Sequence, residues 1–376
     1  MLQQRPNTAG SIFSTVAVTL VCLCSAGAVE TERAADIEPL PPKGFAEVGG
    51  SNYVMFHVGE AYRKRFEKES WFRPGVLHPI VGTFHLQNRN EVREQLAAMH
   101  RGGQRKIALL VWLCHLPDGV ETDGVYGHTV ASNGGALLPQ HAQNLRDFLQ
   151  LLRETEYFNA LNFRFALQGV SSPDQWETWD EALYRENWEV LISIRTIVQE
   201  NMVSSGMDVV YDLGAELGGS EAGQARAYVR RLWGDYTSRF GAEDTYGFSV
   251  ALYPGRVRRL LEDLDGSGDR PSAYALDVYD HVNEWLGEAS REFRGAGIDR
   301  PRVIIQETYY NDPTALRELQ RAQKDHGLEF LYLMQWPCVR DYPVPHFSVD
   351  FPAEYDAYAT FPPAPESDSQ DPAADD

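Results

Sequence analysis

The stretch that decides the fold is Met207-Asp-Val-Val-Tyr-Asp-Leu-Gly-Ala-Glu216, in which a short apolar run ends in glycine, alanine and an acid. A run of this length, rich in valine and closed by a glycine, is typical of a buried strand followed by a loop. A second stretch, Arg302-Val-Ile-Ile-Gln-Glu307, also passes from apolar residues to a glutamate. An amphipathic stretch follows each of them, so we interpret both as strand–loop–helix units with an acid near the strand end.

The same alternation continues over most of the chain. Near-continuous apolar strands separated by helices indicate a parallel sheet covered on both faces. Eight such units predict an α/β fold of the (β/α)₈ TIM-barrel type. A doubly wound open sheet is the alternative, but no glycine-rich loop with Rossmann or Walker spacing follows any strand. The expected strands are His78–His85, Lys106–Leu113, Leu161–Leu167, Met207–Leu213, Tyr246–Leu252, Ala273–Tyr279, Val303–Glu307 and Glu329–Gln335. The expected helices are Glu91–His100, His141–Glu154, Glu181–Met202, Glu221–Phe240, Arg256–Leu264, Val282–Phe293 and Asp312–His326.

Segments of different composition flank the expected barrel domain, residues 71–361. Residues 1–28 contain an apolar run and end in small residues, which is typical of a cleaved secretory signal and too short for a membrane span. Residues 29–70 are predicted to form a linker and N-terminal extension, and residues 362–376 a disordered acidic tail. We therefore expect a single-domain protein, secreted or periplasmic, cleaved near Ala28 and not inserted in a membrane.

The formal net charge of −20 restricts the partners. A protein this acidic is repelled by nucleic acid and by anionic membranes, so we expect no nucleic-acid partner. The charge also argues against a polyanionic substrate, unless arginine and lysine residues cluster locally. The sequence predicts no oligomeric state.

Cys114 and Cys338 remain once the signal is removed. They follow the expected second and eighth strands, and the intervening strand places them far apart for a disulfide. Two isolated thiols are the preferred interpretation, and a Cys114–Cys338 disulfide is the alternative.

Glu216 and Glu307 would follow the fourth and seventh strands, at the barrel rim where the active sites of such barrels lie. Hydrolysis of a glycosidic bond needs one carboxylic acid to protonate the leaving oxygen and one carboxylate to attack or to activate water. We expect Glu216 to be the acid/base, with a raised pKa, and Glu307 the nucleophile. Asp277 and Asp280 are reserve carboxylates. For Glu216, favourable placement before a helix is the plain alternative explanation.

In this arrangement the chain resembles the clan A glycoside hydrolases, which are retaining barrels with an acid/base on strand four and a nucleophile on strand seven. The resemblance covers most of residues 78–340 and rests on strand order and a few residues. It implies that Tyr279 donates a hydrogen bond to the nucleophile and that Trp336 forms the aromatic floor under the cleaved sugar. It also implies an asparagine directly before the acid/base, to bind the sugar 2-hydroxyl. Ala215 occupies that position, so this contact is lost or comes from another side chain.

Several other residues are candidates for contact with substrate. Arg164, between Phe163 and Phe165, is expected to hold Glu307 or Asp212 ionised, or to form a structural ion pair. Trp176 and Trp179 follow the third strand and suit stacking on sugar rings. The alternative is that they only cover the hydrophobic core as a lid. His85 and His115 are expected to be sugar contacts or polar caps.

The sequence thus predicts a secreted glycosidase that cleaves a poly- or oligosaccharide by retaining double displacement, without metal or cofactor. One alternative is a non-catalytic carbohydrate-binding barrel involved in polysaccharide export or assembly, for which Ala215 is the main support. A weaker alternative is a metal-dependent hydrolase using His85 and His115, although the histidines lack metal-site spacing. No Gly-x-Ser-x-Gly motif supports serine hydrolysis.

Overall fold

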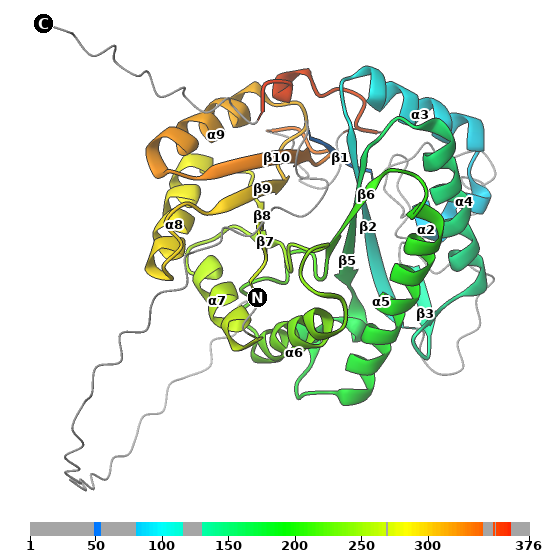
Figure 1. Cartoon of the computed structure of the whole chain (residues 1–376), viewed down its shortest axis with the longest axis horizontal. Helices are drawn as coiled ribbons and strands as arrows, with labels where there is room; N and C mark the ends of the chain where they lie inside the picture. Colours follow the sequence, from blue (N-terminus) through cyan, green and yellow to red (C-terminus); the bar gives the residue numbers. More distant parts are fainter. Residues whose placement is uncertain are drawn as a thin grey trace, which may run out of the picture. The chain divides into compact units, whose positions relative to one another are not determined.

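Parallel strands form a ring, with helices arranged around it (Figure 1). The eight strands of this ring are β1 (Gly50–Asn52), β2 (Lys106–His115), β5 (Ala160–Leu167), β6 (Asp208–Asp212), β7 (Val250–Ala251), β8 (Tyr274–Asp277), β9 (Arg302–Glu307) and β10 (Glu329–Gln335). Strand β1 pairs with β2, β2 with β5 and β5 with β6. Strand β7 pairs with β8, β8 with β9, β9 with β10 and β10 with β1. A parallel bridge between Tyr211 and Thr245 closes the ring between β6 and β7, and the predicted barrel is therefore confirmed.

The computed structural model describes residues 49–53, 80–115, 130–267, 270–340, 349 and 351–361. These residues all fall within one compact unit, Leu40–Asp376. The predicted signal peptide (1–28) and acidic tail (362–376) lie outside the described residues, as does most of the predicted extension (29–70).

Helices connect successive strands and cover the outside of the ring (Figure 1). They are α2 (Ile80–Thr83), α3 (Arg89–Arg101), α4 (Pro139–Thr155), α5 (Glu181–Met202), α6 (Gly223–Phe240), α7 (Arg256–Leu264), α8 (Val282–Gly295) and α9 (Pro313–His326). Each predicted helix is present within a few residues. After β10, the described part of the chain contains only the 3₁₀ turn η5 (Asp356–Tyr358), so the eighth helix of the ideal barrel is not found there.

The connections between barrel strands and helices contain several short elements. The hairpin β3 (Val130–Asn133) and β4 (Ala136–Leu137) extends the sheet beside the end of β2. Further 3₁₀ turns are η1 (Phe84–Leu86), η2 (Gly169–Ser171), η3 (Pro173–Gln175) and η4 (Asp265–Ser267). Residues 116–129, in the connection between β2 and β3, are outside the described residues.

The first barrel strand is not the one that we expected from the sequence. Residues 80–85 of the expected strand His78–His85 are helical, and the barrel strand is β1, so the expected domain start at residue 71 is too late. Strand β1 reads Gly-Ser-Asn and is fully buried, yet it has no apolar side chain for a hydrophobic pattern to detect. A side chain at Gly50 would meet the carbonyl oxygen of Lys106 at 1.9 Å, so only glycine permits this approach of the two strands.

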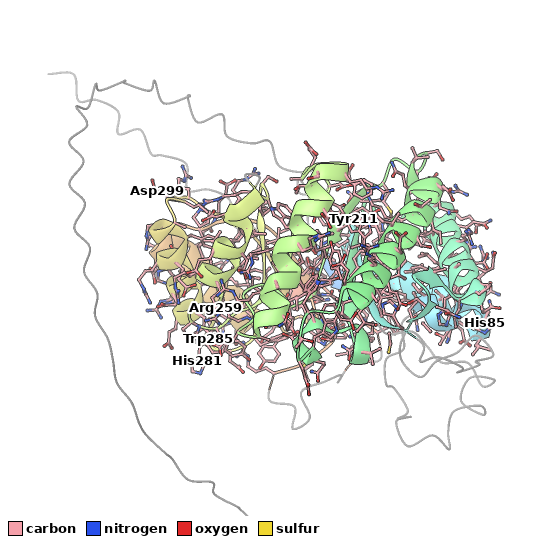
Figure 2. All side chains as sticks on the ribbon, turned by 90° about the horizontal axis from the view of Figure 1, so that it is seen from below. His85, Tyr211, Arg259, His281, Trp285 and Asp299 are labelled. Carbon is pink, nitrogen blue, oxygen red and sulfur yellow. The ribbon has the colours of Figure 1, made fainter. Side chains whose placement is uncertain are left out.

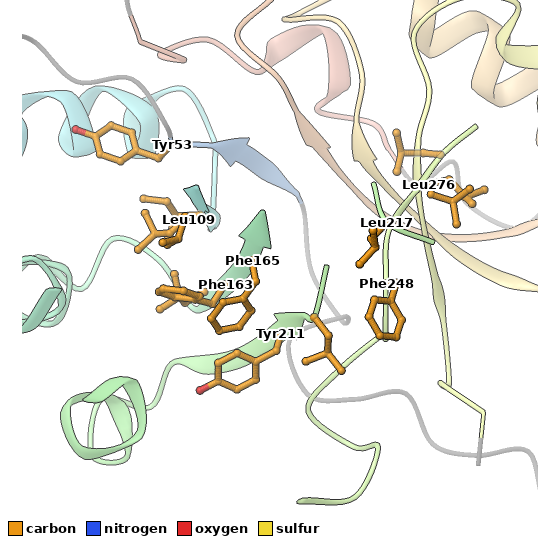
Figure 3. Close-up of a cluster of buried hydrophobic side chains, with 14 of the residues drawn as sticks. Tyr53, Leu109, Phe163, Phe165, Tyr211, Leu217, Phe248 and Leu276 are labelled. Carbon is orange, nitrogen blue, oxygen red and sulfur yellow. The ribbon is translucent and has the colours of Figure 1, made fainter. Parts of the chain in front are cut away.

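Side-chain alternation gives β5 an apolar outward face and a polar inward face. Phe163 and Phe165 of β5 pack with Tyr211 in the apolar cluster, which is shown in Figure 3. The alternate residues Asn162 and Arg164 point the other way and make hydrogen bonds across the barrel interior. Because a one-residue shift in register would reverse these faces, the two phenylalanines fix the inward direction of the Arg164 guanidinium.

Two further findings concern predictions about the chain as a whole. Cys114 and Cys338 carry thiols, as preferred over a mutual disulfide. Within the described residues, we find no helix that combines the length and the apolar character needed to span a membrane.

Candidate active site

Glu307 is the last residue of β9 and is held by two hydrogen bonds. The Arg164 guanidinium donates to Glu307 Oε1 at 2.5 Å, and the Tyr279 hydroxyl donates to Glu307 Oε2 at 2.7 Å. The glutamate is only 7% exposed. Both carboxylate oxygens therefore have a donor, one of them charged, and these bonds fix the orientation of the carboxylate.

Arg164 is fully buried and forms ion pairs with three carboxylates. Besides Glu307, it contacts Asp212 at 3.0 Å and Asp277 at 3.4 Å. Although burial lowers the pKa of Arg164, the three carboxylates together raise it well above its ordinary value. The guanidinium lies behind the carboxylates, so the structure supports the predicted pairing with Glu307 and Asp212 and not a direct contact with substrate.

Asp277 is the third carboxylate of this cluster, and one cation cannot neutralise three anions. Burial raises the pKa of Asp277 well above its ordinary value, and the negative charge of Glu307 raises it further against the pull of Arg164. Among the described residues, Asp277 Oδ1 is buried without a hydrogen-bond partner. A proton on Asp277 removes one negative charge from the cluster and leaves the guanidinium to Asp212 and Glu307.

Glu216 lies in the loop after β6 and has an uncommon backbone conformation. Its φ of +57° is in the left-handed region, which is uncommon for a residue with a side chain. The Glu216 N–H donates to Ser249 Oγ at 2.9 Å, and its carbonyl accepts from the Arg256 guanidinium at 2.6 Å. These two bonds hold the strained residue in place.

The Glu216 side chain is exposed, because it lines a cleft, yet protein surrounds it closely enough to desolvate the carboxyl group. Burial raises the pKa of Glu216 to about 7, and the negative charge of Glu307 contributes to the rise. Arg164 and Arg256 act in the opposite direction. Glu216 is therefore a carboxyl group that holds a proton near neutral pH beside a second acid that is bound by a guanidinium.

Two adjoining pockets meet at Glu216. The Glu307 pocket, of about 500 Å³, is lined by Glu216, Glu307, Asp277 and Tyr279 among others. The Arg256 pocket, of about 990 Å³, is lined by Glu216, Arg256 and Arg259 but not by Glu307. Leu167, Gln168, Ala215 and Tyr253 belong to both walls. Pockets of this size accommodate several sugar rings or a small ligand.

Aromatic side chains line the Glu307 pocket. Trp336 directly follows β10 and lies on the wall of this pocket, at the place expected of an aromatic floor. Three further aromatic residues on this wall were not among the predicted site residues: Trp112, Trp285 and Tyr309. Trp176 lines the Arg256 pocket, with its indole N–H donating to the Val170 carbonyl at 2.9 Å.

Trp179, His85 and His115 are not on the walls of either pocket. Trp179 packs edge-to-face on Trp176 and donates to Glu181 at 3.1 Å. His85 is exposed and pairs with Asn144, and Figure 2 shows it on the opposite side of the barrel from Arg259 and Trp285. The structure therefore does not support a sugar-binding role for Trp179 or His85.

His115 is buried at the end of β2. Its ring nitrogens contact the hydroxyl of Ser132 and, at 2.8 Å, the side-chain oxygen of Asn187. Burial lowers the pKa of His115, against the opposing effects of Glu186 and Asn187. These contacts describe a satisfied core histidine. Over the described residues no cluster of three or more histidine, cysteine, aspartate or glutamate side chains is arranged to hold a metal ion.

Three polar or charged residues on the pocket walls were also missed, because residue type alone gave no reason to select them. Gln168 directly follows β5 and lines both pockets, and we find no hydrogen bond from its side-chain amide to any other described residue. Arg256 and Arg259 belong to the run Arg-Val-Arg-Arg of α7, which in a sequence is indistinguishable from a solvated helix face. Only the approach of α7 to the loop after β6 brings them to the cleft.

Comparison with known proteins gives structural neighbours only. No family model matches the sequence, and neither does any curated protein. An exo-β-1,4-mannosidase from Opitutaceae bacterium strain TAV5 matches with a TM-score of 0.45 and 15% identity, over 79% of this chain and 53% of its own, so this chain spans about half its length. A GH5_18 protein from Bifidobacterium longum subsp. infantis matches with a TM-score of 0.47 and 10% identity, over 79% of this chain and 73% of that chain.

A GH5-4 broad-specificity endoglucanase from Clostridium acetobutylicum matches with a TM-score of 0.43 and 9% identity, over 83% of this chain and 96% of that chain. These likenesses are distant. The barrel assignment therefore rests on the strand pairing, and the chemistry on the residues of the cleft.

Proposed function

We propose that this protein is a glycoside hydrolase that cleaves a poly- or oligosaccharide with retention of configuration, and that it acts outside the cytoplasm. The observation that carries the proposal is the contrast between two acids of one cleft. Glu307 accepts hydrogen bonds from a guanidinium and a phenol, whereas Glu216 has a pKa raised to about 7. A fixed carboxylate facing a protonated carboxyl group is what the cleavage of a glycosidic bond requires.

In the first half of the reaction, a Glu307 oxygen attacks the anomeric carbon of the sugar. The bond from that carbon to the leaving oxygen breaks, and Glu216 gives its proton to the leaving oxygen. In the second half, Glu216 takes a proton from water, which attacks the anomeric carbon and releases the Glu307 carboxylate. The Tyr279 hydroxyl donates to one Glu307 oxygen and so holds the nucleophile in place. Its orientation is kept while Glu307 loses its negative charge in the first half of the reaction and regains it in the second.

The absence of an asparagine before Glu216 needs a compensating group. Ala215 is on both pocket walls but offers no side-chain donor there. Gln168 is on the same two walls, and its amide makes no hydrogen bond with the other described residues. We propose that the Gln168 amide supplies the contact with the sugar beside the reacting carbon.

The second candidate is a barrel that binds carbohydrate without cleaving it. Ala215 favours it, because the usual transition-state contact is missing at that position. The raised pKa of Glu216 favours catalysis instead, since a binding protein gains nothing from a proton held at that carboxyl group.

The experiment that separates the two candidates is a glycan panel incubated with the protein, with reducing ends and binding both measured. Release of reducing ends by the wild type, and not by Glu307→Ala with an unchanged circular dichroism spectrum, supports the hydrolase. Binding of a glycan without any release over long incubation supports the binding protein.

A further inference from the structure

The Arg256 pocket lies on the leaving-group side of the site, if the proposed function holds. The sugar attacked by Glu307 must occupy the Glu307 pocket, because only this pocket is lined by both acids. Glu216 protonates the leaving oxygen and lies on the boundary between the pockets. The part of the substrate that departs must therefore extend past Glu216 into the Arg256 pocket.

Two arginines of the first turns of α7 belong to the wall of this pocket. The Arg256 guanidinium donates to the carbonyl oxygens of Gly218, at 3.2 Å, and Glu216, at 2.6 Å. Arg259 donates from Nε to the carbonyl oxygen of Gly219 at 2.9 Å. Both guanidinium groups are thus anchored to the loop after β6 by backbone carbonyls, which fix the direction of the planes without neutralising their charge.

Glycine makes this anchoring achievable. Gly219 has a φ of +66°, and a side chain at this position would lie 1.9 Å from the carbonyl oxygen of Arg256. The loop backbone and the start of α7 therefore touch directly. The position of Arg256 beside Glu216 is built into the loop and does not depend on side-chain packing alone.

The charge of this pair is poorly compensated. Arg256 forms no ion pair with any described carboxylate, and it is half-buried. Burial, together with the neighbouring charge of Arg259, lowers the pKa of Arg256 despite the opposing pull of Glu216. Arg259 is paired with Glu221 at 3.3 Å, but the Glu221 side chain is 85% exposed and this ion pair is weak.

The remaining acid of the wall, Asp174, accepts a hydrogen bond from the Ser220 hydroxyl at 2.7 Å. With its pKa raised to about 7, Glu216 is about half protonated at neutral pH and largely protonated below it. The protein has a formal net charge of −20, yet the half-buried Arg256 guanidinium has no counter-ion among the described carboxylates. This positive charge lies on the wall of a pocket that is large enough for a sugar.

We propose that Arg256 and Arg259 bind an oxyanion substituent, a carboxylate or a sulfate, on the leaving-group part of the substrate. The substrate is then an acidic glycan that carries uronic acid or sulfated residues on that side of the cleavage point. Arginine binds either anion through paired hydrogen bonds of fixed geometry, so the pair selects for charge and position together. This is the local clustering of arginine that a polyanionic substrate requires of such an acidic protein.

The test is binding by isothermal titration calorimetry in a Glu307→Gln background, which suppresses turnover. The probes are uronic acid trisaccharides and their neutral methyl esters, and sulfated cellotriose beside unsubstituted cellotriose. The acidic member of at least one matched pair should bind about tenfold to a hundredfold more tightly than its neutral partner, with a preference that declines as salt rises. Preference for the uronate or for the sulfate then identifies the source of the oxyanion.

Arg258→Gln is the matched control, since Arg258 is on the same helix and pairs with Glu262 away from both pockets. Arg256→Lys and Arg259→Gln should each remove most of the preference, whereas Arg258→Gln should retain it. The proposal is overturned by equal binding of the acidic and neutral members, by no binding of any acidic probe at millimolar concentration, or by an equal loss in Arg258→Gln. Binding is used because Arg256 also holds the Glu216 carbonyl: a purely structural role would weaken the binding of both members of a pair alike.

The failure of this proposal can be told apart from the failure of the proposed function. An enzyme that hydrolyses neutral glycans without this preference refutes the arginine proposal alone. Acidic glycans bound but never cleaved by the wild type refute the hydrolase alone.

Discussion

Glu307 and Glu216 line one cleft but are held in opposite ways. Glu307 belongs to a strand, is nearly buried, and has a donor on each oxygen. Glu216 belongs to a loop, has a left-handed backbone that is tied down at its N–H and its carbonyl, and has its carboxyl group open to the cleft. The barrel thus fixes the orientation of one acid through its side chain and the other through its backbone. This difference teaches that two residues of one type acquire different chemical roles from their surroundings: a guanidinium and a phenol bind Glu307, whereas the pKa of Glu216 is raised to about 7.

The largest expected effect comes from removing the acid that is held by two side-chain donors, Glu307. Glu307→Gln keeps the shape of the side chain but provides no nucleophile, so turnover should fall by about 10⁴-fold or more. Initial rates of reducing-end release measure the effect. Asp280→Asn is the matched control, because Asp280 lines the same pocket but bonds only to Tyr309 and Arg340 among the described residues. A larger loss in Asp280→Asn than in Glu307→Gln would contradict the assignment.

The second way is to titrate the protonated member. The pKa of Glu216 is raised to about 7, so kcat/KM of the wild type should fall as the pH rises through this value and Glu216 loses the proton that the leaving oxygen needs. Glu216→Gln should lower the rate by about 10² to 10⁴-fold for natural leaving groups and flatten this alkaline limb. An unchanged limb in Glu216→Gln would assign the titration to another group.

Tyr279→Phe sharpens the comparison from the Glu307 side. It removes the phenol that donates to Glu307 Oε2 and leaves Arg164 in place. A hydrogen bond to a charged group contributes about 1.5–3 kcal/mol, so kcat/KM should fall about tenfold to a hundredfold. Tyr309→Phe, which alters a neighbouring phenol bound to Asp280, should have a smaller effect. Equal losses in the two variants would mean that the tyrosines act only through packing.

The smallest expected effect concerns the missing asparagine. Gln168→Ala should lower kcat/KM by roughly threefold to tenfold, as expected for one neutral hydrogen bond of about 0.5–1.5 kcal/mol. The loss should disappear with a substrate that lacks the hydroxyl next to the reacting carbon. Gln175→Ala, on the wall of the Arg256 pocket only, is the control. An equal loss with and without that hydroxyl would place Gln168 elsewhere in the mechanism.

Most of the barrel could be predicted from the sequence, because strands β5 to β10 and helices α3 to α9 have apolar residues at the spacing of buried strands and amphipathic helices. Strand β1 could not be predicted, since Gly50, Ser51 and Asn52 are buried through hydrogen bonds and close backbone contact. Hydrophobic patterns carry no information about such a strand.

The candidate site was predicted only where strand ends determine position. Glu307, Tyr279 and Trp336 lie at or just beyond strand ends, and the structure brings all three to one pocket. Trp179, His85 and His115 were selected by residue type, which does not specify the direction of a side chain. Arg256 and Ser249 reach Glu216 through loop geometry that no spacing rule describes.

The most direct test of the central claim, that Glu216 and Glu307 act as a retaining pair, is the anomeric configuration of the first product, followed by ¹H NMR from the start of hydrolysis. The account predicts that the product first appears with the configuration of the cleaved bond and only later mutarotates. A product that first appears with the inverted configuration would contradict it, because Glu307 would then activate water instead of attacking the sugar.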